Sequence, residues 1–242
     1  NDLIITLFGD ITQGIIIKDH FNSNGSIEHL EFSNGPTRNL IGMGFTFQQT
    51  DMHDNISGTS YDDVIYGNGG NDTVLGEAGN DTIVGGVGND SLNGGAGNDT
   101  YIWNLGDGFD TITEGAGTDK IVFGEGINFE NLTFKQEGNS LNIYVNDDKT
   151  QGIQIYNYFY SSGYNIETLE FADASTVNLT QIGLTFNQHD GSENISTTNY
   201  DDIIYAEGGD DTINAQNGND TIYGGSGNDT INAGNGNDTI VG

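Results

Sequence analysis

Residues 67–102 read GNGGNDTVL, GEAGNDTIV, GGVGNDSLN and GGAGNDTYI, one nine-residue pattern in four consecutive copies. A degenerate unit, GTSYDDVIY, precedes them at residues 58–66. The pattern returns at residues 197–241 as TTNYDDIIY, AEGGDDTIN, AQNGNDTIY, GGSGNDTIN and AGNGNDTIV. Position four is glycine in all but the two leading units, whereas position six is always aspartate. A short fixed period of this kind indicates a stacked repeat architecture.

A second, longer repeat has a period of about 139 residues. Residues 1–21 match residues 139–159, and residues 39–66 match residues 178–205. The first residues lack the basic and apolar regions of a signal peptide. The chain also starts and stops within its pattern, so we expect a fragment of a longer tandem array.

The charge balance restricts the possible partners. Five Lys and Arg residues face 36 Asp and Glu residues, which gives a formal net charge of -31. Such a surface repels nucleic-acid phosphates and anionic membranes. There is no cysteine, and no apolar run approaches the ~20 residues of a transmembrane helix. Because self-repulsion opposes compaction, we expect an external cation to neutralise the fold.

Each nine-residue unit predicts a turn followed by a short strand. Position seven is usually threonine and position eight is always large and apolar, as in strands. Glycine in the first six positions permits positive φ, and asparagine at position five also tolerates the left-handed region. One apolar residue in nine cannot form a core within its own unit, so units must stack. The sequence therefore predicts an all-β fold, a parallel β-roll with two units per 18-residue turn and position eight inside.

Stacking places the position-six aspartates in columns. Asp72 and Asp90 would lie on one side, and Asp63, Asp81 and Asp99 on the other. Like charges at the strand spacing of about 4.7–4.9 Å are destabilising unless a cation bridges them. Calcium accepts 6–8 oxygen ligands in flexible geometry, whereas magnesium dehydrates reluctantly. We therefore expect several Ca²⁺ ions.

These units resemble the RTX (repeats-in-toxin) nonapeptide GGxGxDxUx, a motif known to bind calcium. The resemblance implies Ca²⁺ between adjacent turns, held by the position-six aspartates and by loop carbonyls. The implied aspartates are Asp63, Asp72, Asp81, Asp90, Asp99, Asp202, Asp211, Asp220, Asp229 and Asp238. The implied glycines are Gly67, Gly69, Gly70, Gly76, Gly79, Gly85, Gly86, Gly88, Gly94, Gly95, Gly97, Gly208, Gly209, Gly218, Gly224, Gly225, Gly227, Gly234 and Gly236. LGDGFD, ending at Asp110, resembles a closing half-site offset by 11 residues, and the segments around Asp54 and Asp190 are candidates to open the rolls.

Four segments are expected. Residues 49–113 and 189–242 form two β-roll blocks, the second truncated. Residues 114–188 form an intervening β-module, and residues 1–48 are part of another. DKIVFGEGI (119–127) and LEFADAS (169–175) resemble the haemolysin-type calcium-binding-related module that lies between RTX blocks.

Catalytic motifs are missing from the sequence. No histidine lies in HExxH, and no GxSxG is present. The adjacent carboxylates, such as Asp62 and Asp63, face opposite sides of a strand, which favours a structural role. We therefore expect no enzymatic activity. The aromatic cluster Tyr156, Tyr158, Phe159, Tyr160 and Tyr164 is interpreted as core packing, with a glycan-stacking or adhesive face as the alternative.

Three hypotheses about function remain open. The first is a structural segment of a secreted or cell-surface RTX toxin, adhesin or surface protein, monomeric within an array. The second is the accessory roll of a secreted hydrolase, lyase or epimerase, and the third is a glycan- or protein-binding module. The RTX resemblance implies export by the type I secretion machinery as an unfolded chain, which then folds on extracellular calcium.

Overall fold

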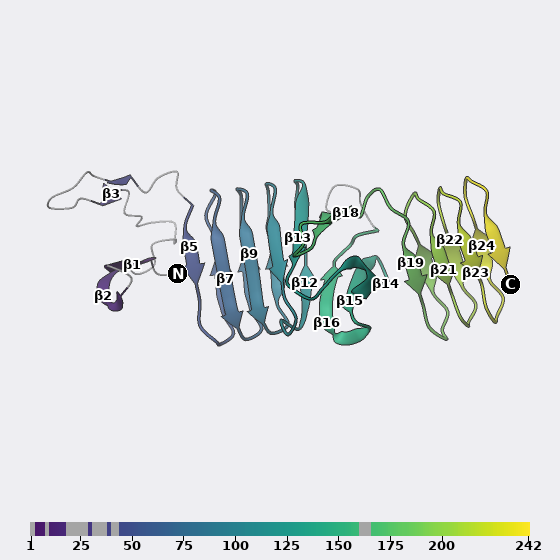
Figure 1. Ribbon diagram of the computed structural model, residues 1–242, viewed down its shortest axis with the longest axis horizontal. Coiled ribbons are helices and arrows are strands. Elements are labelled where there is room, and N and C mark those ends of the chain that lie inside the picture. Colours follow the sequence, from purple (N-terminus) through teal and green to yellow (C-terminus); the bar gives the residue numbers. More distant parts are fainter. Residues whose placement is uncertain (1–2, 8–9, 18–28, 31–37, 40–43, 160–165) are drawn as a thin grey trace.

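The computed structural model describes residues 3–7, 10–17, 29–30, 38–39, 44–159 and 166–242. Figure 1 shows short strands stacked side by side along one long axis, from β5 to the C-terminal strands. The described residues form strands and one short 3₁₀ helix, η1 (Phe129–Asn131), and contain no α-helix. No described helix has the length and apolarity needed to cross a bilayer. The predicted all-β, parallel β-solenoid is confirmed.

The first roll alternates its strands between two sheets. One sheet contains β5 (Thr46–Gln48), β7 (Val64–Gly69), β9 (Thr82–Val87), β11 (Thr100–Trp103) and β13 (Asp119–Phe123). The other contains β6 (Asn55–Ser57), β8 (Thr73–Leu75), β10 (Ser91–Asn93) and β12 (Phe109–Ile112). All these pairings are parallel, and Ile65 opposite Ile83 is typical of the 18-residue register. Two nine-residue units therefore make one turn, as predicted.

The second roll repeats this arrangement. β19 (Thr185–Asn187), β21 (Ile203–Tyr205), β23 (Thr221–Tyr223) and β25 (Thr239–Val241) pair in parallel on one face. β20 (Asn194–Ser196), β22 (Thr212–Asn214) and β24 (Thr230–Asn232) form a three-stranded sheet on the other face. Position-eight side chains fill the interior of both rolls: Ile65, Val74, Ile83, Leu92, Tyr101, Ile204, Ile213 and Ile222 are all buried. Ile240, in the last described strand, is exposed.

The turns differ from the prediction at one position. Glycine at position four has positive φ in every full unit, for example 124° at Gly79. Asparagine at position five does not adopt the left-handed region; the non-glycine residues that do so within the units stand at position two, such as Asn68 and Glu77. The position-five side chain instead accepts a backbone N–H from the next turn, as Asn71 Oδ1 does from Asn89 N–H at 3.0 Å. That hydrogen bond requires a short side-chain acceptor, which explains asparagine at this position.

An antiparallel insertion lies between the two rolls. β14 (Leu132–Glu137), β15 (Ser140–Val145) and β16 (Asp148–Ile155) form a meander. β16 pairs in parallel with β12, and β14 pairs in parallel with β19, so one 11-stranded sheet passes through both rolls. On the opposite face β17 (Ile166–Glu170) pairs in parallel with β13 and antiparallel with β18 (Thr176–Asn178). The intervening segment thus continues the solenoid.

Two small antiparallel pairs are described near the N-terminus. β1 (Leu3–Leu7) pairs with β2 (Asp10–Ile17), and β3 (His29–Leu30) pairs with β4 (Arg38–Asn39). The β1–β2 pair has the same sequence pattern as β15–β16, which is also antiparallel. The 139-residue sequence repeat therefore has a structural counterpart.

Two adjacent isoleucines test the core assignment. Ile204 is fully buried, whereas Ile203 on the same strand is 38% exposed. Ile204→Ala should lower the free energy of unfolding in saturating calcium by about 2–5 kcal/mol, because it leaves a cavity between the sheets. Ile203→Ala should cost less than about 1 kcal/mol. Equal losses in denaturant unfolding would contradict the inward orientation of position eight.

Candidate calcium-binding columns

The position-six aspartates form two columns in each roll, joined by hydrogen bonds between turns. Oδ1 of each aspartate accepts the backbone N–H of the position-six residue one turn earlier. Asp81 N–H donates to Asp99 Oδ1 at 2.7 Å, and Asp72 N–H donates to Asp90 Oδ1 at 2.8 Å. The same bond joins Asp63 to Asp81, Asp202 to Asp220, Asp211 to Asp229 and Asp220 to Asp238. The predicted columns are therefore present in both rolls.

The second oxygen of most of these carboxylates has no partner. Oδ2 is buried and accepts no hydrogen bond in Asp72, Asp81, Asp90, Asp99, Asp211 and Asp220. These six side chains are at most 3% exposed. A buried carboxylate oxygen without a donor is costly unless a cation takes the place of water. This set of unpaired oxygens is the clearest sign of a ligand in the structure.

In the first roll, glycine at position one opens the space beside the unpaired oxygens. A Cβ added at Gly67 or Gly76 would collide with Oδ2 of the aspartate in the same unit and with the carbonyl oxygen of the position-one glycine one turn later. Carboxylate and carbonyl oxygens therefore converge at this point. In the second roll Ala206 and Ala215 occupy position one, and the free oxygens of Asp211 and Asp220 persist beside them. The donor set is oxygen only, which fits calcium.

The predicted site glycines fall into three structural groups. Gly67, Gly76, Gly85, Gly94 and Gly224 stand at position one, next to an aspartate Oδ2. Gly70, Gly79, Gly86, Gly88, Gly95, Gly97, Gly209, Gly218, Gly225, Gly227, Gly234 and Gly236 have positive φ and lie against the backbone of the preceding turn. Gly69 and Gly208 stand at position three. A Cβ added at Gly69 would make only van der Waals contacts with Asp51, and one added at Gly208 would approach the side chains of Ser226 and Asp190. Only the first group lines the space beside the carboxylates.

The leading unit of each roll differs from the others. Asp63 Oδ2 accepts hydrogen bonds from the backbone N–H and hydroxyl of Thr59, at 2.5 and 2.9 Å. Thr198 does the same for Asp202. Threonine at position two therefore satisfies the oxygen that is free in the glycine-rich units. Asp229 and Asp238 are only partly buried.

The structure places the flanking half-sites in the columns, with one change. Asp110 Oδ1 accepts the N–H of Asp90 at 2.9 Å, and Asp54 N–H donates to Asp72 Oδ1 at 2.8 Å. At the start of the second roll the position-six residue is Glu193, whose N–H donates to Asp211 Oδ1 at 2.9 Å. Asp190 is exposed at position three.

Sequence reasoning missed Asp119. Its Oδ1 accepts the N–H of Asp99 at 2.7 Å, so it continues the column of Asp63, Asp81 and Asp99. The signal was present: EGAGTDKIV (114–122) is another nine-residue unit, in register with Asp110. A two-residue insertion at Trp103 and Asn104 shifts the frame and hides both closing units.

Burial raises the pKa of several column carboxyls in the first roll. Desolvation lifts the pKa of Asp81 to about 7, of Asp90 to about 6 and of Asp110 to about 8, and hydrogen bonds from the backbone only partly offset it. Neighbouring carboxylates of the same column add to the rise, as Asp99 and Asp63 do for Asp81. In the absence of metal, Asp81, Asp90 and Asp110 therefore keep their protons to a higher pH than exposed aspartates do.

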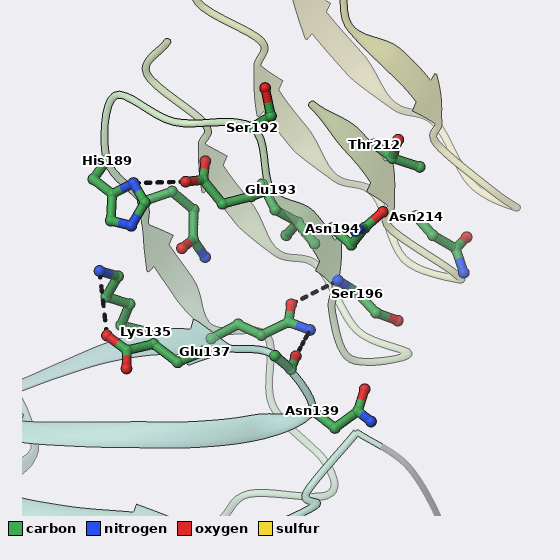
Figure 2. A pocket seen from close by; sticks show the side chains of 14 residues that line it. Lys135, Glu137, Asn139, His189, Ser192, Glu193, Asn194, Ser196, Thr212 and Asn214 are labelled. Atoms are coloured by element: carbon green, nitrogen blue, oxygen red, sulfur yellow. Dashed lines mark hydrogen bonds and ion pairs between the residues drawn. The ribbon is translucent and has the colours of Figure 1, made fainter. Parts of the chain in front are cut away.

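A separate pocket of about 650 Å³ lies between the β14–β15 hairpin and β20. Figure 2 shows that its charged side chains pair with one another: Lys135 with Glu137 at 3.4 Å and His189 with Glu193 at 2.6 Å. Gln136 accepts the backbone N–H of Ser196 at 2.6 Å. The Gln136–Ser196 hydrogen bond attaches the hairpin to the second roll, which indicates a joint between segments, whereas Glu193 Oε2 and Gln188 Nε2 are buried without a hydrogen-bond partner.

The aromatic cluster contributes mainly to the core where it is described. Tyr158 is 7% exposed, and its hydroxyl donates to the carbonyl of Leu179 at 3.2 Å. Phe159 packs against Phe186 with ring centroids 6.0 Å apart. Tyr156 is exposed, whereas Tyr160 and Tyr164 lie outside the described residues. Core packing therefore accounts for Tyr158 and Phe159.

The raised pKa values predict a pH dependence for the metal-free chain. Because the folded pKa values of Asp81, Asp90 and Asp110 exceed their unfolded values near 3.8, protonation favours the fold. Stability should rise as pH falls from about 8 to about 4. Far-UV circular dichroism in chelator should show increasing β-structure over this window, with sedimentation as the control for aggregation near the pI of about 4.1. Loss of β-structure on acidification would contradict this.

Comparison with known proteins agrees with the geometry. The RTX calcium-binding nonapeptide repeat (4 copies) matches residues 50–83, 75–102, 104–130, 189–222 and 215–242. The haemolysin-type calcium binding protein related domain matches residues 142–181, which confirms the resemblance of the intervening segment. No curated protein matches the chain.

Two solved structures show similarity. The solution structure of the AlgE6R3 subunit from the Azotobacter vinelandii mannuronan C5-epimerase is 23% identical, with 43% of this chain and 70% of that chain covered and a TM-score of 0.28. The crystal structure of the extracellular lipase LipA from Serratia marcescens is 16% identical, with 75% and 29% covered and a TM-score of 0.19. The repeat matches span more than half of the 242 residues and carry calcium-binding units. The chain therefore belongs to the family of RTX calcium-binding nonapeptide repeat proteins.

Proposed function

We propose that this chain is a structural segment of a large secreted bacterial RTX protein and that it folds when it binds Ca²⁺. The observation that carries the proposal is the set of six buried aspartate oxygens without partners, four of which lie beside a position-one glycine. In this proposal the position-six aspartates and nearby turn carbonyls hold Ca²⁺ between successive turns. The six free oxygens are its strongest members, whereas threonine already occupies the second oxygen of Asp63 and Asp202.

Electrostatics links calcium binding to folding. The net charge of -31 opposes compaction, and the columns place like charges one strand spacing apart in a buried environment. Calcium neutralises these charges and satisfies the unpaired oxygens. A site that is formed only by stacked turns does not exist in the unfolded chain, so the free energy of metal binding becomes free energy of folding.

The same coupling supports an extracellular role. Extracellular calcium modules bind calcium with dissociation constants of about 10⁻⁴–10⁻³ M. With such an affinity the chain would stay unfolded at the low free calcium of a bacterial cytosol and would fold at the higher calcium concentration outside the cell. The absence of cysteine means that folding outside needs no disulfide formation. We therefore infer export as an unfolded chain through a type I system, to the medium or the cell surface. A toxin, adhesin or surface protein fits the tandem 139-residue repeat better than the accessory roll of a secreted hydrolase, lyase or epimerase.

The proposed organisation keeps four segments. Residues 49–113 and 189–242 are the calcium-dependent rolls, and residues 114–188 and 1–48 are the intervening modules. Antiparallel strands in residues 132–155 bury Leu141, Ile143 and Ile153 almost completely, so this module has an apolar core of its own. The proposed role of the module is to join rolls into one stiff rod, and this role requires no catalysis.

Two adjacent aspartates test the ligand assignment. Asp211 is buried with a free Oδ2, whereas Asp210 is exposed at position five and accepts Asn228 N–H at 2.9 Å. Asp211→Asn should remove calcium from its site and raise the calcium midpoint of folding by on the order of tenfold, about 1.4 kcal/mol. Asp210→Asn should have little effect, because Asn219 makes the same hydrogen bond to Asn237 N–H at 3.0 Å.

Isothermal titration of both variants against the parent chain gives the number of ions and their affinities. Both substitutions remove one negative charge from neighbouring residues, so a difference between them reports position and not net charge. Equal shifts for Asp210→Asn and Asp211→Asn would reject the ligand assignment.

A further inference from the structure

One unit at the end of the first roll has a carboxylate at position one, where the units of residues 58–102 have glycine. In EGAGTDKIV (114–122) position one is Glu114, and the structure brings its carboxylate to Asp99 and Asp119. One oxygen from each of these three residues lies within 4.8 Å of the others. Asp99 and Asp119 are 1% exposed and Glu114 is 6% exposed. Three carboxylates therefore share one buried site, whereas the regular sites combine aspartate with glycine carbonyls.

No positively charged side chain among the described residues forms an ion pair with this three-carboxylate site. The ion pairs among the described residues are Lys120 with Glu170, Lys135 with Glu137 and His189 with Glu193, and none reaches the site. Asp99 Oδ1 accepts the N–H of Asp81, but its Oδ2 is buried without any partner. This unpaired oxygen is independent evidence for a missing ligand, in addition to the proximity of the three acids.

Glu114 is held in place by specific contacts. The hydroxyl of Tyr101 donates to Glu114 Oε1, and the N–H of Gly115 donates to Oε2 at 2.9 Å. Tyr101 itself accepts the N–H of Gly94 at 2.6 Å. Tyr101 is the one position-eight residue of the quoted units that is not aliphatic, and its hydroxyl reaches the only glutamate at position one of a first-roll unit. These two departures from the repeat together orient the third carboxylate.

We propose that Asp99, Glu114 and Asp119 form a calcium site that differs from the other sites of the column by its third carboxylate, Glu114, and binds calcium more tightly than they do. Its three carboxylates give it a higher negative charge than a single aspartate with carbonyls, and affinity for calcium rises with ligand charge. The inference rests on the proposed function in one respect, that calcium is the ion available to the chain.

The site also links the roll to the intervening segment. Glu114 lies in the segment that connects β12 to β13, and Asp119 is the first residue of β13. The N–H of Asp119 donates to Glu167 Oε2 at 2.7 Å, which extends the column to β17. A tightly held ion here would fix the last turn of the first roll next to β17.

Glu114→Gln tests the site, with Glu130→Gln as the matched control. Both variants lose one negative charge, but Glu130 is exposed in η1 and lies outside the cluster. Radioactive calcium in equilibrium dialysis against the intact 242-residue chain measures the ions that remain bound at low free calcium. The parent chain and Glu130→Gln should keep one ion at free calcium about tenfold below the midpoint of the other sites, a difference of about 1.4 kcal/mol. Glu114→Gln should lose that ion and keep the weaker ones.

Each other outcome has a definite meaning. A tight ion that persists in Glu114→Gln, or an equal loss in both variants, overturns the proposed site. If Glu114→Gln does not fold in saturating calcium, Glu114→Asp, which keeps the charge but withdraws it by one methylene, must bind the tight ion more weakly; unchanged binding overturns the proposal. If the parent chain binds no calcium at any free calcium concentration, the proposed function itself is rejected. The two failures are therefore distinguishable.

Discussion

The two oxygens of the position-six carboxylates have different roles, and the rest of the structure depends on that difference. One oxygen accepts a backbone N–H from the neighbouring turn and so fixes the register of the stack. The other oxygen is buried and unpaired in Asp72, Asp81, Asp90, Asp99, Asp211 and Asp220. The register places like charges in columns, so the hydrogen bond that aligns the turns also creates the repulsion that a cation has to remove. Raised pKa values at Asp81, Asp90 and Asp110 express the same conflict in terms of protons.

The two kinds of segment are stabilised differently. Each repeat unit buries one large side chain, such as Ile83, and the glycine-rich turns contribute little apolar area. The intervening segment has longer strands and stacked aromatics, including Phe123 and Phe171 with ring centroids 5.7 Å apart. Burial of apolar area stabilises this segment without a metal ion. The rod therefore alternates metal-dependent rolls with modules that have a conventional core, and β14 and β16 connect them through shared sheet edges.

Sequence periodicity was sufficient to predict the parallel roll, the 18-residue turn, the inward position eight and the aspartate columns, because each follows from one residue type at one fixed spacing. Other features depend on partners distant in sequence. The pairing of β14 with β19 joins residues about fifty positions apart and has no local signal. Asp119 was missed because the insertion at Trp103 and Asn104 breaks the period. The left-handed residue stands at position two, not five, because the position-five side chain makes a hydrogen bond between turns.

Far-UV circular dichroism during a calcium titration, with magnesium as the control, tests the central claim most directly. If the columns require calcium, β-structure in the chain at neutral pH should appear cooperatively at sub-millimolar to millimolar calcium and should not appear with magnesium. β-structure that persists in full in excess chelator would contradict the account, because it would show that the rolls fold without a cation in their carboxylate columns.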